Sequence, residues 1–291
     1  MQTVWRIKDL LEWTTRYFLD KGISESRLEA EILLAHVLKK DRVYLYANYE
    51  APVNMDERAI YKEYIKRRTK SEPIAYITGH KEFMSLDFEV SPQVLIPRPD
   101  TELLVETAIK ATRDLNSVRI VDVGTGSGAI AVSLAYYIDQ AEIYATDISL
   151  SALEIARRNA GCHNVDIDFR ESDLLETFLV SQAEGIPCSF DMIIANLPYV
   201  AETERETLDP QVLDFEPHLA LFAGEDGLDL YRQLIPQARM LLQEGGALLF
   251  EIDPRQANLI PSIMEGFSDV RILKDAAGRE RVVQARRSQY D

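Results

Sequence analysis

The stretch Val118-Arg-Ile-Val-Asp-Val-Gly-Thr-Gly-Ser-Gly128 indicates the fold of the larger part of the chain. It begins with an apolar run typical of a strand buried on both faces, and it leads straight into three glycines, Gly124, Gly126 and Gly128. The residues that follow, Ala129 to Tyr137, favour a helix. Because glycine has no Cβ, such a turn lets a ligand touch the backbone, and the first helical turn offers it unpaired N–H groups.

Strands and helices alternate through the rest of the chain, which predicts a parallel sheet covered by helices on both faces. The first of these helices is expected from Asp100, which can cap it, to about Thr112. The last two strands follow each other closely enough to form an antiparallel edge. The expected strands are residues 119–123, 142–146, 167–171, 191–195, 247–252, 270–274 and 281–286.

The chain before this region has a different pattern. From Ile7 to about Lys70 the apolar residues recur at helical spacing, which predicts a small helical bundle. Ser26 and Glu29 have the spacing of a capping box at the start of one helix. The pattern then changes to short alternating stretches at 74–77 and 83–90, which we interpret as a β-hairpin linker. Three parts are therefore expected, at residues 1–72, 73–98 and 99–291.

Composition narrows the class of protein. A chain of 291 residues is long enough for two domains. It has no run of about 18 apolar residues and no signal peptide, so we expect a cytoplasmic protein without a membrane partner. Cys162 and Cys188 form no metal-binding pattern, so no metal site is expected. The net charge of −16 opposes attraction to a phosphate backbone, so direct nucleic-acid binding is not expected.

Two acidic residues near the ends of later strands support a ligand site at the glycine turn. Asp147 ends the strand after the turn, where its carboxylate can accept hydrogen bonds from both hydroxyls of a ribose. Asp173 suits an adenine amino group, and Leu174 suits packing against the adenine ring. The G-x-G-x-G spacing lacks the extra residue of the dinucleotide fingerprint.

This set of residues resembles the class I S-adenosylmethionine methyltransferases. The resemblance implies a doubly wound seven-stranded sheet with a reversed last strand, and S-adenosylmethionine as the cofactor. The residues expected to bind it are Gly124, Thr125, Gly126, Ser127, Gly128, Asp147, Asp173, Leu174 and Asn196.

The tetrapeptide Asn196-Leu197-Pro198-Tyr199 follows the expected strand 191–195 and so faces the same crevice as the glycines. It resembles the N-P-P-Y motif of methyltransferases that act on planar nitrogens, with Leu197 in place of the first proline. The Asn196 oxygen and the backbone carbonyl of Leu197 would accept the two N–H groups of an amide and aim its nitrogen at the methyl donor. Tyr199 would stack on the amide, and Pro198 restricts Leu197 to extended conformations.

Several separated segments also resemble the HemK family, the release factor glutamine N5-methyltransferases. The chain departs from the family at Asp100, where Glu is usual, and at Asp253, where the family has glycine. The resemblance implies that the substrate is the glutamine of a Gly-Gly-Gln loop in bacterial class-1 peptide release factors. It assigns residues 1–72 to substrate docking, 73–98 to the hairpin linker and 99–291 to methyl transfer. The matching segments, besides the tetrapeptide, are residues 67–68, 73–79, 83–90, 94–102, 216–217, 220–221, 224–228, 274–275, 278 and 281–283.

Three alternatives stay open at this point. The substrate could be a glutamine of a ribosomal protein, or an adenine or guanine amino group of a nucleic acid. A third possibility is a cofactor-binding module that has lost turnover through the departures at Leu197 and Asp253. The sequence also leaves open the oligomeric state, the order of binding, the preferred release factor, and whether Arg98, Thr101 and Glu102 form a rigid hinge or cover the cofactor.

Overall fold

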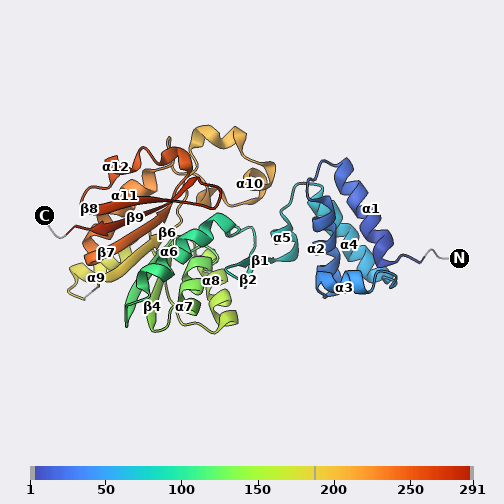
Figure 1. Ribbon diagram of the computed structural model, residues 1–291, viewed down its shortest axis with the longest axis horizontal. Helices are drawn as coiled ribbons and strands as arrows, with labels where there is room; N and C mark the ends of the chain where they lie inside the picture. Colours follow the sequence, from blue (N-terminus) through green and yellow to red (C-terminus); the bar gives the residue numbers. More distant parts are fainter. Residues whose placement is uncertain (1–3, 187, 289–291) are drawn as a thin grey trace. The chain divides into compact units, whose positions relative to one another are not determined.

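The computed structural model describes residues 4–186 and 188–288. The chain divides into two compact units, and the first ends at Gly79 while the second begins at His80 (Figure 1). Within the described residues, no helix is both long enough and apolar enough to cross a membrane.

The first unit is the helical bundle that the sequence predicts. Phe18, Leu33 and Leu34 are fully buried in its core. The Tyr61 hydroxyl donates a 3.0 Å hydrogen bond to the Ala30 carbonyl oxygen and so joins the second and fourth helices. The helices are α1 (Ile7–Asp20), α2 (Ser26–Leu38), α3 (Arg42–Ala47), α4 (Met55–Arg68) and α5 (Ile74–Thr78).

Two local expectations in this region are wrong. Ser26 does not cap α2: it is the first residue of the helix, and Glu25 stands at the capping position without a side-chain bond. The Glu29 carboxylate instead forms an ion pair with the buried guanidinium of Arg68, at 2.6 Å, which connects α4 to α2. The stretch 74–77 is helical rather than extended, because Pro73 starts a short helix that Gly79 ends in the left-handed conformation.

The predicted hairpin is formed by β1 (His80–Phe83) and β2 (Leu86–Glu89), which pair antiparallel. Phe83 and Phe88 point into the core of the second unit, where they meet Leu104 from the helix after the hairpin. The Glu102 carboxylate accepts the Met84 N–H at 2.8 Å and fixes the hairpin to that helix.

The second unit has a seven-stranded sheet in the order β5-β4-β3-β6-β7-β9-β8. The strands from β5 to β7 are parallel, and β9 runs antiparallel to both of its neighbours. The prediction of a seven-stranded methyltransferase sheet with a reversed last strand is therefore confirmed. The strands are β3 (Val118–Val123), β4 (Ala141–Asp147), β5 (Asp168–Glu171), β6 (Phe190–Ala195), β7 (Leu242–Glu251), β8 (Phe267–Lys274) and β9 (Glu280–Arg287).

Helices cover both faces of this sheet (Figure 1). Side chains along β3 alternate between the two cores, with Ile120 in one and Val121 in the other, as the pleat of a strand requires. The helices are α6 (Glu102–Thr112), α7 (Ala129–Tyr137), α8 (Leu150–His163), α9 (Glu176–Ala183), α10 (Pro210–Phe215), α11 (Asp229–Leu241) and α12 (Ile260–Ile263). Short 3-10 turns are η1 (Pro99–Thr101), η2 (Glu202–Thr207), η3 (His218–Ala220) and η4 (Pro254–Gln256).

Asp100 does not cap α6, contrary to expectation. It lies inside η1, and its carboxylate pairs with Arg279 and Arg281, each at 3.1 Å. These arginines come from the turn before β9 and from β9 itself, so the ion pairs connect the start of α6 to the reversed strand. Two nearby positive charges outweigh a single capping bond for this carboxylate.

Candidate active site

The glycine turn follows β3 as predicted, and its backbone is held on one side by the next strand. The N–H groups of Gly124 and Thr125 both donate to the Thr146 carbonyl oxygen at 2.9 Å. Gly126 has φ +55°, and a Cβ there would have no neighbour within 4 Å. Gly128, in contrast, faces α8, where a Cβ would lie 3.0 Å from the Ala156 Cβ. The middle of the turn is open to a ligand, whereas its end serves helix packing.

Asp122 is a buried carboxyl beneath this turn that the sequence pattern did not single out. Its Oδ2 accepts hydrogen bonds from the Thr125 hydroxyl at 2.6 Å and from the Ala131 N–H at 3.2 Å. Burial raises the pKa of Asp122 to about 7, although these two hydrogen bonds oppose the rise. One acidic residue within a run of valine and isoleucine was the signal that could have pointed to it.

Most of the predicted binding residues line one cavity of about 230 Å³ at the carboxyl ends of β3, β4 and β6. Gly128 and Tyr199 do not line it. Tyr199 instead lines an adjoining smaller cavity, of about 130 Å³, which shares Asn196 with the first. The predicted residues on the larger cavity are Gly124, Thr125, Gly126, Ser127, Asp147, Asp173, Leu174, Asn196, Leu197 and Pro198.

The donors and acceptors of this cavity fit S-adenosylmethionine. The two carboxylate oxygens of Asp147 accept the N–H groups of Gly126 and Ser149, at 2.8 and 2.9 Å, and their remaining lone pairs can take ribose hydroxyls. Burial raises the pKa of Asp147, while the backbone donors lower it. Leu174 is held at φ +47°, a conformation rare for a branched side chain, and it faces the same cavity. Such strain is common at ligand sites.

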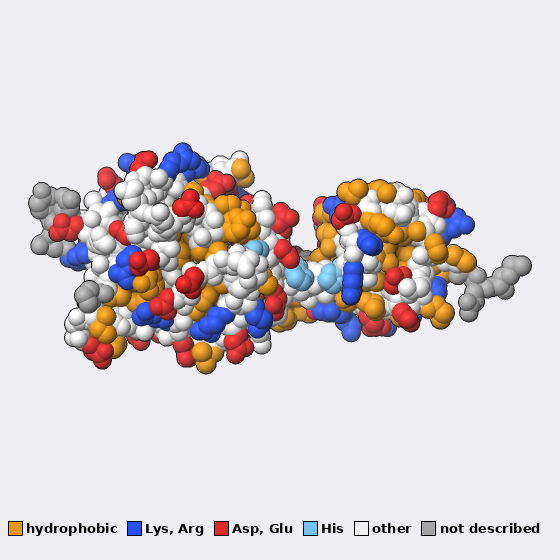
Figure 2. All heavy atoms as spheres, turned by 90° about the horizontal axis from the view of Figure 1, so that it is seen from below, with side chains coloured by type: hydrophobic (Ala, Val, Ile, Leu, Met, Phe, Trp, Pro, Cys, Tyr) orange, Lys and Arg blue, Asp and Glu red, His pale blue; other side chains and the backbone are white. Residues whose placement is uncertain are grey.

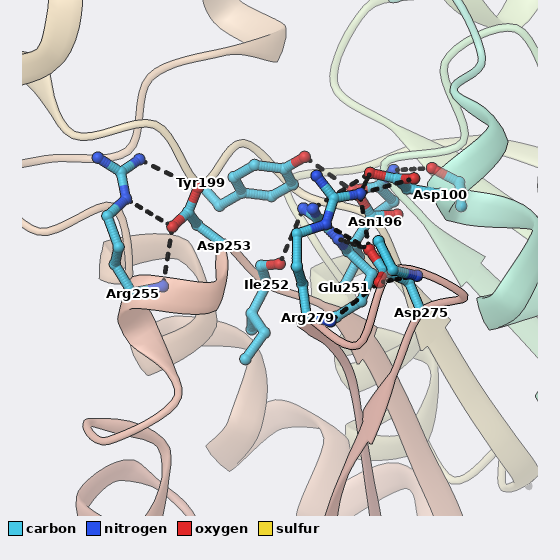
Figure 3. A network of polar contacts seen from close by, with 12 residues as sticks. Asp100, Asn196, Tyr199, Glu251, Ile252, Asp253, Arg255, Asp275 and Arg279 are labelled. Carbon is cyan, nitrogen blue, oxygen red and sulfur yellow. Dashed lines mark hydrogen bonds and ion pairs between the residues drawn. The ribbon is translucent and has the colours of Figure 1, made fainter.

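Polar contacts fix the first and the last residue of the tetrapeptide after β6. Figure 3 shows the polar network around Asn196, Tyr199 and Glu251. Nδ2 of Asn196 donates to the Thr101 hydroxyl oxygen at 3.0 Å. The Tyr199 hydroxyl donates to Oε1 of Glu251 at 3.1 Å. Glu251, at the end of β7, thus connects the last residue of the tetrapeptide to the sheet, whereas Thr101 of η1 holds the first.

Glu251 is fully buried, and its Oε2 has no hydrogen-bond partner among the described residues. Burial raises its pKa, while the hydroxyls of Thr101 and Tyr199 and the charge of Arg281 lower it. Burial of the Tyr199 side chain, together with the negative charge of Glu251, raises the pKa of Tyr199. This phenol therefore stays protonated and acts as a donor. Among the described residues, no group of three or more metal-binding side chains is found.

Two family models match the chain. The PrmC N-terminal domain matches residues 9–79, and the Methyltransferase small domain matches residues 99–212. The chain is 40% identical to the release factor glutamine methyltransferase of Geobacter sulfurreducens over 97% of both chains. It is 43% identical to that of Koribacter versatilis over 90% of this chain and 91% of the relative. The chain belongs to the release factor glutamine methyltransferase family.

Solved structures support the fold of this family member. The Thermus thermophilus 16S rRNA N2 G1207 methyltransferase in complex with AdoMet and guanosine superposes with a TM-score of 0.52 at 18% identity, over 72% of this chain and 49% of that one. The catalytic domain of hMettl16 gives the same TM-score at 16% identity, over 84% and 86%. The sequence-based resemblance to the HemK family is thus confirmed, and so is the use of S-adenosylmethionine.

The departure at Asp253 lies outside both cavities of this release factor glutamine methyltransferase family member. The Asp253 carboxylate accepts the backbone N–H of Arg255 at 2.9 Å and its side chain at 2.7 Å. Burial would raise the pKa of Asp253, but Arg255 lowers it. Because Arg255 also reaches Glu204 of η2 at 2.9 Å, Asp253 is a structural link to the loop after the tetrapeptide.

The three residues that the sequence left unassigned have different places. Arg98 and Thr101 line the larger cavity, whereas Glu102 holds the hairpin. Arg98 forms an ion pair with Glu216, whose pKa is raised by burial and lowered by this arginine. Sequence reasoning gave no role to four buried residues, Asp122, Glu216, Tyr231 and Glu251. Glu216, Tyr231 and Glu251 bond partners distant in sequence, whereas Asp122 bonds the nearby Thr125 and Ala131.

Proposed function

We propose that this protein transfers a methyl group from S-adenosylmethionine to the side-chain amide nitrogen of the glutamine in the Gly-Gly-Gln motif of bacterial class-1 release factors. The proposal follows from family membership and from one observation above all: Nδ2 of Asn196 is bonded to Thr101. With its nitrogen engaged there, Asn196 has Oδ1 left as an acceptor at the junction of the two cavities.

The proposed cofactor residues surround the larger cavity. The open backbone at Gly126 would approach the methionine part of the cofactor, Asp147 would accept the ribose hydroxyls, and Asp173 with Leu174 would hold the adenine. When bound, S-adenosylmethionine supplies an electrophilic methyl group on a positively charged sulfonium.

The chain's own residues would then orient the substrate amide. An amide nitrogen is a weak nucleophile, because its lone pair is delocalised into the carbonyl. Asn196 Oδ1 would accept one N–H and the Leu197 carbonyl the other, which fixes the amide plane and directs the nitrogen toward the larger cavity. Tyr199, held by Glu251, would form a wall of the smaller cavity, which receives the side chain. Orientation supplies most of the rate in this scheme.

The test is methyl transfer from labelled S-adenosylmethionine to a purified class-1 release factor, with the label located by mass spectrometry. We expect label on the Gly-Gly-Gln glutamine, and none when that glutamine is changed to alanine. Asn196→Ala should abolish transfer, whereas Asn258→Ala should not, since Asn258 is an exposed asparagine that also precedes a leucine. Label on a ribosomal protein or a nucleic acid, and none on the factor, would refute the proposal.

We further propose that the helical unit docks the release factor and that the reaction takes place in the cytoplasm, where translation terminates. The unit has a core of its own, and apolar side chains reach its surface in several places (Figure 2), among them Val43 at 73% and Tyr46 at 56% exposure. Removing residues 1–79 should raise KM for the factor at least tenfold and leave the Kd for S-adenosylmethionine unchanged. An unchanged KM in a variant that still binds the cofactor would contradict docking by this unit.

A further inference from the structure

The backbone N–H of Leu197 is held by a tyrosine from another element. It donates to the hydroxyl oxygen of Tyr231 on α11 at 3.2 Å, and that hydroxyl donates to the Glu251 carbonyl oxygen at 2.6 Å. Tyr231 is fully buried, with its ring centroid 4.5 Å from that of Phe250. A buried ring with both sides of its hydroxyl occupied is a rigid support for the peptide that it holds.

The side chain of Leu197 is fixed from the opposite direction. It is only 4% exposed, and a Cβ on Gly124 would lie 2.8 Å from its Cδ2. The leucine side chain therefore packs against the glycine turn, while its backbone N–H is hydrogen-bonded to Tyr231 of α11. These two contacts place one residue of the catalytic segment against both the cofactor turn and the substrate cavity.

A leucine and a proline differ at this position in two ways. The proline ring locks φ and carries no N–H, so an N-P-P-Y segment is stiff without a donor to satisfy. Leucine restores the free φ and adds a buried N–H, which costs stability unless it finds an acceptor. The Tyr231 hydroxyl supplies that acceptor and restrains the peptide at the same time.

We propose that Tyr231 is a positioning residue. Its hydroxyl holds the backbone N–H of Leu197, so that the Leu197 carbonyl is placed to accept the substrate N–H. In this chain the hydrogen bond does what the first proline ring does in N-P-P-Y members. The inference rests on the proposed function, because the carbonyl matters only if an amide is the substrate.

A double-mutant cycle of Tyr231→Phe and Leu197→Pro tests the inference. Tyr231→Phe should lower the single-turnover methylation rate about tenfold, as expected for loss of a buried hydrogen bond, with the Kd for S-adenosylmethionine unchanged. In the Leu197→Pro background the same change should have little effect, because no N–H is left to hold. An equal loss in both backgrounds would overturn the inference, since Tyr231 would then act through Glu251 alone.

The controls separate this role from general stability. Tyr137→Phe removes a hydroxyl that likewise donates to a backbone carbonyl, that of Met84 at 2.7 Å, but away from both cavities, and should leave the rate unchanged. If Leu197→Pro does not fold, replacing the amide between Asn196 and Leu197 by an ester removes the same N–H and leaves the Leu197 carbonyl intact. The same cycle is then run with the ester.

A second measurement does not depend on the substrate. Labelling Asn carbonyl carbons and Leu nitrogens selects the amides of Leu197 and Leu259, which follow Asn196 and Asn258, and Leu197→Pro assigns the two signals. Tyr231→Phe should accelerate hydrogen exchange at Leu197 at least tenfold and leave Leu259 unchanged. Unaltered exchange at Leu197 would overturn the inference. If exchange changes as expected but no release factor is methylated, only the proposed function fails.

Discussion

The Thr101 hydroxyl oxygen accepts a 3.0 Å hydrogen bond from Nδ2 of Asn196. An amide nitrogen can only donate, so the Thr101 hydroxyl oxygen is the acceptor in this hydrogen bond. The amide of Asn196 is therefore held with its nitrogen away from the substrate and its oxygen free to accept. A threonine of η1 thus fixes the orientation of the asparagine for which we propose the catalytic role.

Thr101→Val should consequently reduce the methylation rate by about 10- to 100-fold. It removes the acceptor for Asn196 and leaves the shape of the side chain almost unchanged. Thr101→Ser keeps the hydroxyl and should retain most of the activity. Thr107→Val is the matched control, because the Thr107 hydroxyl donates to the Leu103 carbonyl within α6 and Thr107 lines neither cavity. Equal rates for Thr101→Val and Thr107→Val would show that the hydroxyl does not orient Asn196.

Asp147 should determine cofactor affinity. Its carboxylate holds the Gly126 N–H at 2.8 Å and faces the larger cavity, so Asp147→Ala removes both the support of the turn and the ribose acceptor. We expect the Kd for S-adenosylmethionine, measured by calorimetry, to rise about 10- to 100-fold. The exposed Asp166 provides the control, and Asp166→Ala should bind as the wild type does. A wild-type Kd for Asp147→Ala would place the ribose elsewhere.

Asp122 should give the protein a specific dependence of stability on pH. Its pKa is raised from 3.8 to about 7, so the folded state holds a proton that the unfolded state has released. The stabilisation is complete below pH 3.8 and is lost as the pH rises toward 7. Relative to Asp122→Asn, the wild type should lose on the order of 2 kcal/mol of unfolding free energy between pH 5 and pH 8.

Urea unfolding of both proteins at several pH values measures this difference. Comparing the two proteins cancels the contributions of titrating groups that do not interact with Asp122. A difference that does not change between pH 5 and pH 8 would mean that Asp122 is ionised throughout this range in the folded protein.

The parts that sequence reasoning placed correctly depend on local rules. The apolar strand before Gly124 and the polar residues at the carboxyl ends of strands are visible in short stretches, so the sheet and most cavity residues could be predicted. The prediction for 74–77 is wrong because four residues are too few to distinguish the alternation of a strand from one helical turn. A proline before it and a glycine after it were the better signals.

The supporting network could not be predicted in the same way. Thr101, Tyr231 and Glu251 are far apart along the chain, and only the fold brings them under the tetrapeptide. The sequence predicts helix-capping roles for Glu29 and Asp100, but each forms an ion pair with an arginine of a distant element. A charged partner that arrives with the tertiary structure displaces the local hydrogen bond that spacing suggests.

Gly227 should be essential for turnover, although it lines neither cavity. Its φ is +74°, and a Cβ there would lie 2.0 Å from the Tyr199 carbonyl oxygen and 2.5 Å from Nε2 of Gln256. The Gln256 amide donates to that carbonyl at 2.9 Å, so the glycine and the glutamine together fix the end of the tetrapeptide. Gly227→Ala should displace Tyr199 and lower the methylation rate at least tenfold.

Gly278 provides a matched control with the same backbone conformation. Its φ is +79°, but a Cβ there meets nothing within 4 Å. Gly278→Ala should therefore cost only about 1 kcal/mol of conformational strain and lower Tm by a few degrees, with kcat unchanged. Both variants are compared below their Tm, so that each is folded. If Gly227→Ala matches Gly278→Ala in kcat, strain at positive φ would account for both, and contact with Tyr199 would have no role in turnover.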